Sequence, residues 1–267
     1  MCYDVSLHSD IEITKKAFPQ IKDRRKDAGS NYPNMEHITS FAFPKYPVII
    51  NNDGEIQLVD MQWSVDPFFE KDPKARAFKR TKMANARSER VIEDKRSMWY
   101  RLRQNHCLIP LSGTYEHREI IGWDIKVPYY IWLEGREGFH VPGLYQIREG
   151  IDEDGNEINE GSFTMLTRPA NDVMKEIHNS GEFKHRMPLF LTPELEQYWL
   201  SNNLTDDNRK AVFEFELPSE NLEYRTVYSV RGRKPRPDGK HKYDLWTYEN
   251  LPSLGDDEAP KVQGTIF

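Results

Sequence analysis

The residues of this chain that could do chemistry include a cysteine at its start. Cys2 directly follows Met1, and such a small second residue permits removal of the initiator methionine. Cysteine would then be the amino terminus and carry a thiol and a primary amine, whose ordinary pKa values are about 8.5 and about 8. Together these groups can condense with an aldehyde into a five-membered thiazolidine ring, whereas an internal cysteine cannot, because its nitrogen is an amide. Its position alone favours the alternative, in which Cys2 is simply the residue that follows the start.

A polar segment, residues 85–89 (NARSE), is the second candidate. In an extended chain Asn85, Arg87 and Glu89 share one face. Arg87 could then hold a phosphate through its bidentate fork, and Asn85 could supply an amide. The alternative is a solvated strand edge next to a helix.

A carboxylate and a histidine complete the set. Glu116 lies in residues 113–117 (GTYEH), just after the apolar run 107–110. Partial burial there would raise its pKa and suit it to general acid–base catalysis near neutral pH, although an exposed glutamate on an alternating strand explains it as well. His178 follows an amphipathic helix and is either a helix cap or a proton donor to a substrate oxygen. His185 competes with it, and the Ile-His-Asn context favours His178.

Aromatic and basic residues indicate where a partner could bind. Trp63, Phe68 and Phe69 precede the strongly basic stretch 71–103, and paired aromatics beside cations suit stacking with unpaired bases. Taken singly, each of these aromatics is more typical of a core. A second basic run, residues 231–242, is expected to be solvated.

Composition limits the class of protein. The chain has 267 residues, which suffice for one large domain or two small ones, and its net charge of −6 is unlike that of most nucleic-acid binders. Two cysteines and no apolar leader favour the cytoplasm. We find no membrane span, no zinc-ligand spacing and no glycine-rich phosphate loop, so no metal, cofactor or membrane partner is expected.

Periodicity and turn signals predict a mixed, β-rich domain rather than a βαβ repeat. The turn at residues 52–55 predicts a hairpin of 48–51 with 56–63. A polar turn is expected at residues 152–156, and the tail after Leu251 is expected to be loose. The remaining predicted strands are 107–111, 114–118, 129–133, 139–145, 163–167, 213–217 and 224–230. The predicted helices are 10–28, interrupted by Pro19, then 97–104, 171–177 and 192–200.

Four motifs, taken in order, resemble the SOS response associated peptidase (SRAP) family. They are Met1-Cys2, NARSE at 85–89, GTYE at 113–116, and Ile177-His178 before RMP at 186–188. The similarity spans roughly residues 1–200. It implies an α+β, β-rich single domain of twisted, mostly antiparallel sheets around a barrel-like core with short flanking helices. Residues 1–230 would form the catalytic domain, and residues 231–267 a C-terminal extension.

The resemblance also implies a function. Such proteins crosslink covalently to abasic sites in single-stranded DNA, through a Schiff base and then a thiazolidine, after releasing their own methionine; a monomer is expected. Departures are Tyr3-Asp4, where many members have Gly-Arg, and the extra residues before the RMP segment. The implied catalytic residues are Cys2 (nucleophile), Asn85 (orientation), Glu116 (proton transfer) and His178 (sugar opening and reversal). The implied DNA-binding residues are Arg87, Trp63, Phe68, Phe69 and Arg186.

Two other classes remain open. One is a cysteine hydrolase with a Cys2–His178 pair oriented by Glu116. The other is a noncatalytic DNA-binding module in which Cys2 is incidental. Blocking the α-amine would abolish crosslinking and spare a thiol hydrolase, whereas Cys2→Ala would leave a binding module intact.

Overall fold

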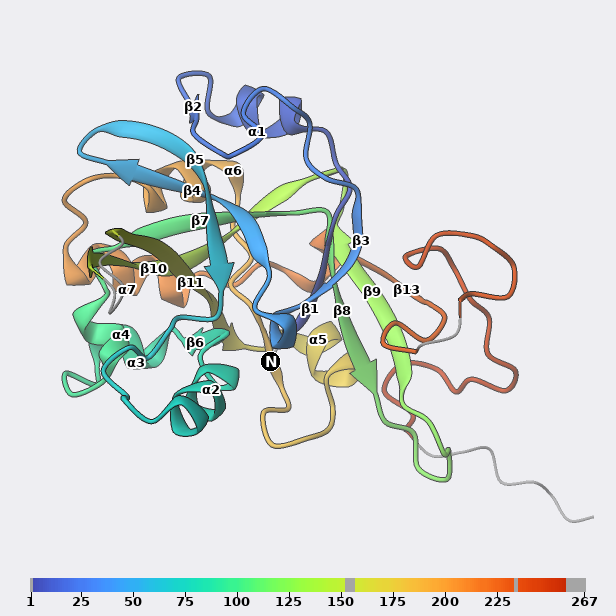
Figure 1. Ribbon diagram of the computed structural model, residues 1–267. Coiled ribbons are helices and arrows are strands. Elements are labelled where there is room, and N and C mark those ends of the chain that lie inside the picture. Colours follow the sequence, from blue (N-terminus) through green and yellow to red (C-terminus); the bar gives the residue numbers. More distant parts are fainter. Residues whose placement is uncertain (1, 152–156, 233–234, 258–267) are drawn as a thin grey trace, which may run out of the picture.

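A computed structural model of the chain describes residues 2–151, 157–232 and 235–257, so the turn predicted at 152–156 lies outside the described residues. Two sheets and several short helices make up this part of the chain (Figure 1). The strands are β1 Asp4–Leu7, β2 Lys22–Asp23, β3 Met35–Thr39, β4 Lys45–Asn52, β5 Glu55–Trp63, β6 Asn85–Arg87, β7 His106–Leu111, β8 Gly113–Arg118, β9 Val127–Leu133, β10 Phe139–Ile151, β11 Glu157–Pro169, β12 Arg186–Pro188 and β13 Leu222–Thr226. The helices are α1 Ile11–Ala17, α2 Pro73–Thr81, α3 Glu89–Ile92, α4 Met98–Arg101, α5 Asp172–Ile177, α6 Pro193–Trp199 and α7 Asp206–Glu214, with 3-10 turns η1 Ser40–Ala42 and η2 Ser219–Asn221.

The larger sheet closes into a barrel. Strands β11, β10, β7, β4 and β5 are neighbours in that order, and β5 returns to pair in parallel with β11 through Phe163 and Trp63. Alternating inward residues of these strands fill the interior. The rings of Trp63 and Phe163 stack there at 6.1 Å. The predicted α+β class with a barrel-like core is therefore confirmed.

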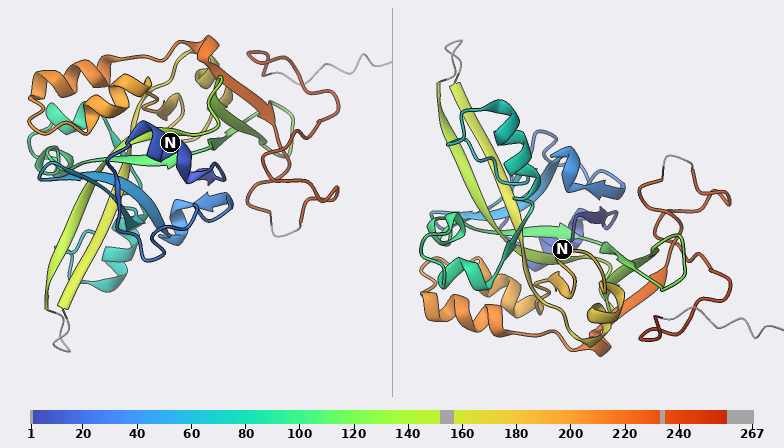
Figure 2. Two further views of the ribbon diagram at one scale, coloured as in Figure 1. Left: turned by 90° about the horizontal axis from the view of Figure 1, so that it is seen from above. Right: turned by 90° about the horizontal axis from the view of Figure 1, so that it is seen from below.

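The long antiparallel pair β10–β11 extends beyond the barrel (Figure 2). At its other end β11 carries two short neighbours, since β6 pairs with it in parallel and β12 pairs with it antiparallel. This end of β11 thus brings residues near 85, 167 and 187 together.

The second sheet has the strand order β13-β9-β8-β1-β3. Asp4 of β1 pairs with Tyr115 of β8, in an antiparallel register. Because the strands run in opposite directions, the residues just before Asp4 lie alongside those just after Tyr115. The sheet thereby carries the start of the chain to Glu116.

The predicted hairpin at 48–63 is confirmed by β4 and β5. Asp53 and Gly54 both have positive φ, at 50° and 96°, as the two-residue turn that matches the twist of the strands requires. The side chain of Asn51 accepts a hydrogen bond from the Gly54 amide at 2.8 Å.

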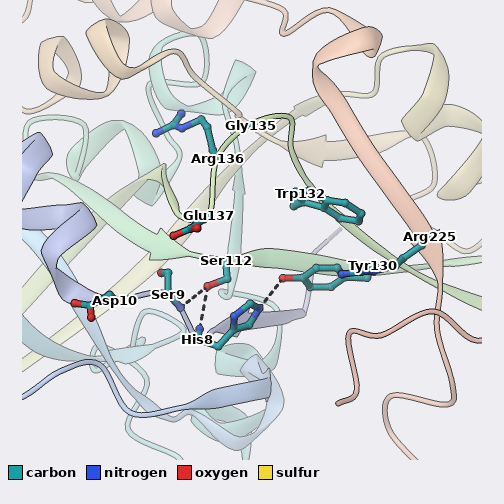
Figure 3. A pocket seen from close by; sticks show the side chains of 10 residues that line it. All are labelled: His8, Ser9, Asp10, Ser112, Tyr130, Trp132, Gly135, Arg136, Glu137 and Arg225. Atoms are coloured by element: carbon teal, nitrogen blue, oxygen red, sulfur yellow. Dashed lines mark hydrogen bonds between the residues drawn. The ribbon is translucent and has the colours of Figure 1, made fainter. Parts of the chain in front are cut away.

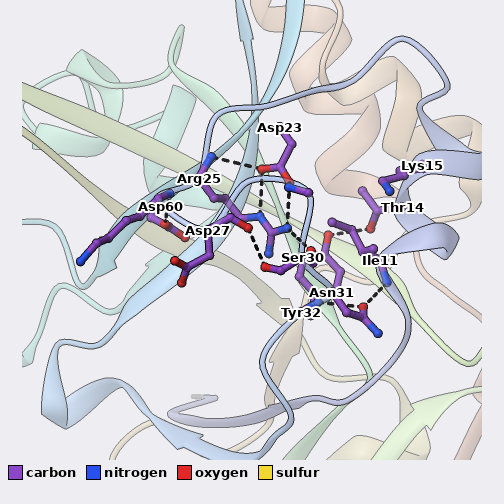
Figure 4. Close-up of polar contacts among 12 residues, drawn as sticks. Ile11, Thr14, Lys15, Asp23, Arg25, Asp27, Ser30, Asn31, Tyr32 and Asp60 are labelled. Atoms are coloured by element: carbon purple, nitrogen blue, oxygen red, sulfur yellow. Dashed lines mark hydrogen bonds and ion pairs between the residues drawn. The ribbon is translucent and has the colours of Figure 1, made fainter.

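The helix predicted over residues 10–28 is only partly present. It begins after the cap Asp10 and ends at Ala17, two residues before the proline. The chain then forms β2 and a loop held by Arg25, whose guanidinium binds Asp23 and donates to the Ser30 carbonyl at 2.7 Å (Figure 4). The expected second half of the helix is therefore absent, and a loop held by side-chain hydrogen bonds stands in its place.

The strand predicted at 213–217 is wrong. Phe213 lies in the last turn of α7 and packs its ring against Trp199 at 5.7 Å. The alternation of residues 213–217 spans the end of a helix and the loop that follows it. Thr205 and Asn208 form a capping box at the start of α7, a signal in the sequence that would have identified the helix.

The expectations for the C-terminal segments also need correction. The tail is not loose over residues 252–257, because the buried guanidinium of Arg118 binds the carbonyls of Pro252 and Ser253 and the carboxylate of Asp257. The basic run 231–242 is not simply solvated either, because Arg236 is buried and pairs with Asp238.

Candidate active site

Cys2 is fully buried and lies two residues before the start of β1. Its carbonyl accepts a hydrogen bond from the Asn85 side-chain amide at 2.7 Å, and its thiol lies 3.5 Å from the Asp4 carbonyl. Burial raises the pKa of the Cys2 thiol well above its ordinary value, and the charges of Glu116 and Asp4 raise it further. The two sheets meet here, because Asn85 comes from β6 of the barrel sheet and Cys2 leads into β1.

Glu116 is buried in the middle of β8, with 5% of its surface exposed. Burial raises its pKa from 4.5 to about 7, so the carboxyl exchanges its proton near neutrality. The alternative of an exposed glutamate is therefore wrong. Its Oε1 and the Oδ1 of Asn85 are buried acceptors with no hydrogen-bond partner among the described residues. Both atoms could accept hydrogen bonds from an amine.

The structure brings His178, and not His185, to Glu116. The Nε2 atom of His178 lies 3.8 Å from the Glu116 carboxylate, and its Nδ1 lies 2.8 Å from the Arg186 carbonyl. Because a carbonyl only accepts, Nδ1 carries the hydrogen in this contact. Burial lowers the pKa of His178 to about 4, which keeps the ring neutral at pH 7. His185 is exposed and has a positive φ of 59°.

The extra residues before the RMP segment form one wall of a cavity. Residues 179–184 loop out between α5 and β12, and the amide of His185 returns to the His178 carbonyl at 2.8 Å. This loop and the side chains around Glu116 and His178 enclose about 330 Å³. Cys2 is fully buried and does not line this cavity, whereas the next two residues, Tyr3 and Asp4, do.

Arg87 and Arg186 differ in their availability. Arg87 is exposed on β6, and its guanidinium lies 5.6 Å above the ring of Phe183 in the same loop. Arg186 is buried, donates to Glu89 at 3.0 Å and to the Thr167 carbonyl at 2.7 Å. Arg87 therefore has a guanidinium that could contact a phosphate, while that of Arg186 is already engaged within the protein.

The aromatic residues also separate into two groups. Trp63 is 1% exposed and donates its indole N–H to the Ala84 carbonyl at 3.0 Å, so it lies in the barrel core, away from any bound strand. Phe68 and Phe69 remain largely exposed, and Lys79 of α2 lies 5.7 Å above the Phe69 ring. The surface beside α2 thus combines exposed rings and cations.

Sequence reasoning missed the pairing of Asp4 with Arg231. Both Asp4 oxygens accept hydrogen bonds from the Arg231 Nε, at 3.1 and 3.0 Å, and His37 binds the same carboxylate at 2.8 Å. Burial alone would raise the pKa of Asp4, but these hydrogen bonds outweigh it and hold the pKa below its ordinary value. Arg231 also lines the cavity next to Glu116. The departure Tyr3-Asp4 therefore recruits a cation from far along the chain.

Residues 39–41 make a further contact near the start of the chain, which the sequence analysis did not identify. Ser40 is buried, and its amide donates to the Tyr3 carbonyl at 2.9 Å. Phe41 stacks on Tyr3 at 4.8 Å and stays exposed. Residues 39–41 thus border the same end of β1.

Two further properties of the described residues bear on the chemistry. No three of their His, Cys, Asp or Glu side chains gather in a way that could hold a metal ion. No helix in the described ranges has the length and apolar character needed to cross a bilayer.

Comparison with known proteins identifies the family. The family model of the SOS response associated peptidase (SRAP) matches residues 1–231. The chain therefore belongs to the SRAP family, whose name associates it with a peptidase-type activity and with the SOS response. A comparison with curated proteins found no match.

Solved structures share the fold. A protein from Bacteroides thetaiotaomicron is 24% identical with a TM-score of 0.70, over 91% of this chain and 97% of its own. A protein from Bordetella bronchiseptica is 20% identical with a TM-score of 0.63, over 85% of this chain and 100% of its own. A phage-related protein from the same organism is 20% identical with a TM-score of 0.61, over 85% and 95%. At these identities the likeness concerns the fold alone.

Proposed function

We propose that this protein captures abasic sites in single-stranded DNA as a covalent crosslink to Cys2, once Met1 has been removed. The observation that carries the proposal is the contact of Asn85 with the Cys2 carbonyl, next in the chain to Tyr3 and Asp4 in the wall of a cavity that Glu116 and His178 also line. Three residues far apart in the sequence, Asn85, Glu116 and His178, thereby lie near one amino-thiol.

The chemistry needs an aldehyde, which the ring-opened sugar of an abasic site provides. The Cys2 amine attacks the carbonyl carbon, and the resulting carbinolamine loses water to give an imine. The Cys2 sulfur then bonds to the same carbon, and its proton passes to the imine nitrogen, which closes the thiazolidine. The net reaction releases one water and needs no oxidant or reductant.

The residues around Cys2 suit these proton transfers. A carboxyl with a pKa of about 7 can donate a proton to the departing water and accept one later, which supports Glu116 as the acid and base. The unpartnered acceptor atoms of Glu116 and Asn85 suit the N–H groups of the new amine. His178 is neutral and close to Glu116, so it is suited to sugar opening and to reversal of the crosslink.

The family name suggests hydrolysis of a peptide bond, and we propose that this bond is the one between Met1 and Cys2. Water adds across this peptide bond, releases methionine and leaves the Cys2 amine free. We assign proton transfer in this step to Glu116, on the same ground of a pKa near neutrality. Met1 itself lies outside the described residues.

The exposed surface supports a DNA strand as the partner. Arg87 offers a fork for a phosphate beside the cavity, and Phe68 and Phe69 offer rings for unpaired bases. Trp63 and Arg186 support this surface from within, by packing and by the ion pair with Glu89.

One observation disfavours the cysteine hydrolase. A hydrolytic cysteine needs a thiolate, which a lowered pKa provides. Burial and two nearby carboxylates instead raise the pKa of the Cys2 thiol. An amine that reacts first, with the thiol second, fits this environment better.

The test is incubation of the protein with single-stranded DNA that carries one abasic site, followed by a denaturing gel. We expect a slow-migrating band with the unaltered protein and none with Cys2→Ser. Mass spectrometry of the same sample should show loss of Met1. A tetrahydrofuran analogue of the lesion is the matched control, because it cannot open to an aldehyde.

Two results would overturn the proposal. One is a protein that has lost Met1 and still gives no band. The other is a band that forms equally with the tetrahydrofuran analogue or with Cys2→Ser.

A further inference from the structure

A second cavity, of about 570 Å³, lies at the other end of β1 (Figure 3). His8 directly follows β1, Ser112 precedes β8, and Trp132 lies near the end of β9. None of its lining residues lines the cavity beside Glu116. The register of β8 and β9 pairs Tyr130 with Tyr115, so Tyr130 and Glu116 point to opposite faces of the sheet. The second cavity is therefore separate from the candidate active site.

One side of this cavity is an aromatic platform. The rings of Tyr130 and Trp132 stack at 5.6 Å, and the Arg225 guanidinium lies 4.7 Å above the Trp132 ring. Arg225 reaches this position because it pairs with Tyr130 across β13 and β9. His8 binds the Tyr130 hydroxyl at 3.2 Å and holds it in place. Trp132 is only partly buried, and both rings of the platform line the cavity.

The charges of the cavity are arranged unevenly. Arg225 makes no ion pair and no hydrogen bond with the described residues, and its Nε is a buried donor without a partner. Arg136, in contrast, is neutralised by Glu196 at 2.8 Å. The carboxylates of Asp10 and Glu137 lie on the side away from Trp132 and Arg225 (Figure 3). The cavity thus offers a cation at one end and acceptors at the other.

We propose that this cavity is a binding site for a nucleotide, with its base on the platform of Tyr130 and Trp132 and its phosphate at Arg225. A guanidinium without a carboxylate partner suits the phosphate, and a π-face suits any base. Asp10 and Glu137 would accept hydrogen bonds from the exocyclic amine of the base. A volume of about 570 Å³ lies in the range of small-molecule sites. This proposal does not depend on the crosslinking proposed above.

The test is calorimetric titration of the full chain with deoxyadenosine monophosphate, deoxyadenosine and inorganic phosphate, each alone. We expect saturable binding of the monophosphate and weaker binding of the other two. Trp132→Ala should weaken the monophosphate at least about 5-fold, as loss of one stacking contact does. Trp132→Phe keeps a ring and should stay within about 3-fold, which separates stacking from a fold defect.

Arg225→Ala should weaken the monophosphate and leave deoxyadenosine unchanged, because only the phosphate contacts the guanidinium. Tyr198→Ala, an exposed ring on α6, is the matched control and should change nothing. Trp132→Ala and Arg225→Ala should also retain the crosslinking yield of the unaltered protein. A failure of this proposal is therefore distinguishable from a failure of the crosslinking proposal.

Three results would overturn the nucleotide site. The first is no saturable heat with about 5 mM of the monophosphate, a concentration at which a site of useful affinity is occupied. The second is binding that Trp132→Ala leaves unchanged in a variant that melts like the unaltered protein. The third is inorganic phosphate that binds as tightly as the nucleotide, because the site would then recognise an anion alone.

Discussion

The substitution Glu116→Gln tests two effects of the buried carboxyl separately. One is its proposed role in crosslinking, and the other is its effect on the free energy of unfolding. The carboxyl lies buried on β8, and burial raises its pKa from 4.5 to about 7. Glutamine has nearly the same shape and cannot ionise. We expect the variant to lose crosslinking by about 100-fold or more, since it can no longer move a proton.

The effect on stability has a definite sign. Between pH 4.5 and 7 the folded state holds the Glu116 proton and the unfolded chain does not, so the unaltered protein loses stability as the pH rises through this window. One pKa unit corresponds to about 1.4 kcal/mol, so the charged form costs the fold about 3 kcal/mol above pH 7. Glutamine removes this cost. The difference in free energy of unfolding, variant minus unaltered protein, should therefore rise by about 3 kcal/mol from pH 4 to pH 8.5.

Urea denaturation of both proteins at pH 4, 5.5, 7 and 8.5 measures the difference. The matched control is Glu134→Gln, which replaces an exposed carboxylate directly after β9. In the control the free energy of unfolding should change by less than about 0.5 kcal/mol at every pH.

A difference between Glu116→Gln and the unaltered protein that stays constant from pH 4 to pH 8.5 would refute the reasoning. It would mean that Glu116 ionises with its ordinary pKa in the folded protein. Unchanged crosslinking in a folded variant would separately remove Glu116 from the proton transfers.

Three further predictions concern other contacts. Asp4→Asn and Arg231→Met, combined in a double-mutant cycle followed by urea denaturation, should give a coupling energy of about 1–3 kcal/mol, and no coupling would contradict the pairing. Phe69→Ala should weaken single-stranded DNA binding in fluorescence anisotropy about 5- to 100-fold, whereas Tyr198→Ala should leave it unchanged; equal effects would contradict a stacking role. Arg118→Gln should cost about 2 kcal/mol and expose residues 252–257 to limited proteolysis, and an unchanged cleavage pattern would contradict its anchoring role.

Much of the fold was predictable because its signals are local. The turn at Asp53-Gly54 identified a hairpin, and the hydroxyl of Thr192 before a proline identified the start of α6. The failure at residues 213–217 was also local, because a short alternating pattern was read without the capping box at Thr205. A pattern of five residues does not distinguish the end of a helix from a strand when both bury their apolar side chains.

The candidate site was predictable in its residue types and less so in their environments. Asn85 contacts Cys2 and the charge of Glu116 acts on its thiol, but Trp63 lies in the core and Arg186 is held by Glu89. Whether an aromatic or a cation faces solvent depends on the strands that cover it. The parallel pairing of β5 with β11, about 100 residues away, buries Trp63.

The amino-acid sequence by itself determined which groups are available: a thiol at Cys2 directly after Met1, a carboxyl at Glu116 and a guanidinium at Arg87. Only the tertiary structure decided how these groups behave. The raised pKa of Glu116 follows from its burial in the folded protein, and the charge of Asp4 is balanced by Arg231, 227 residues away. The physical reason is that backbone preferences act over a few residues, whereas desolvation and charge pairing depend on every segment that the fold brings near.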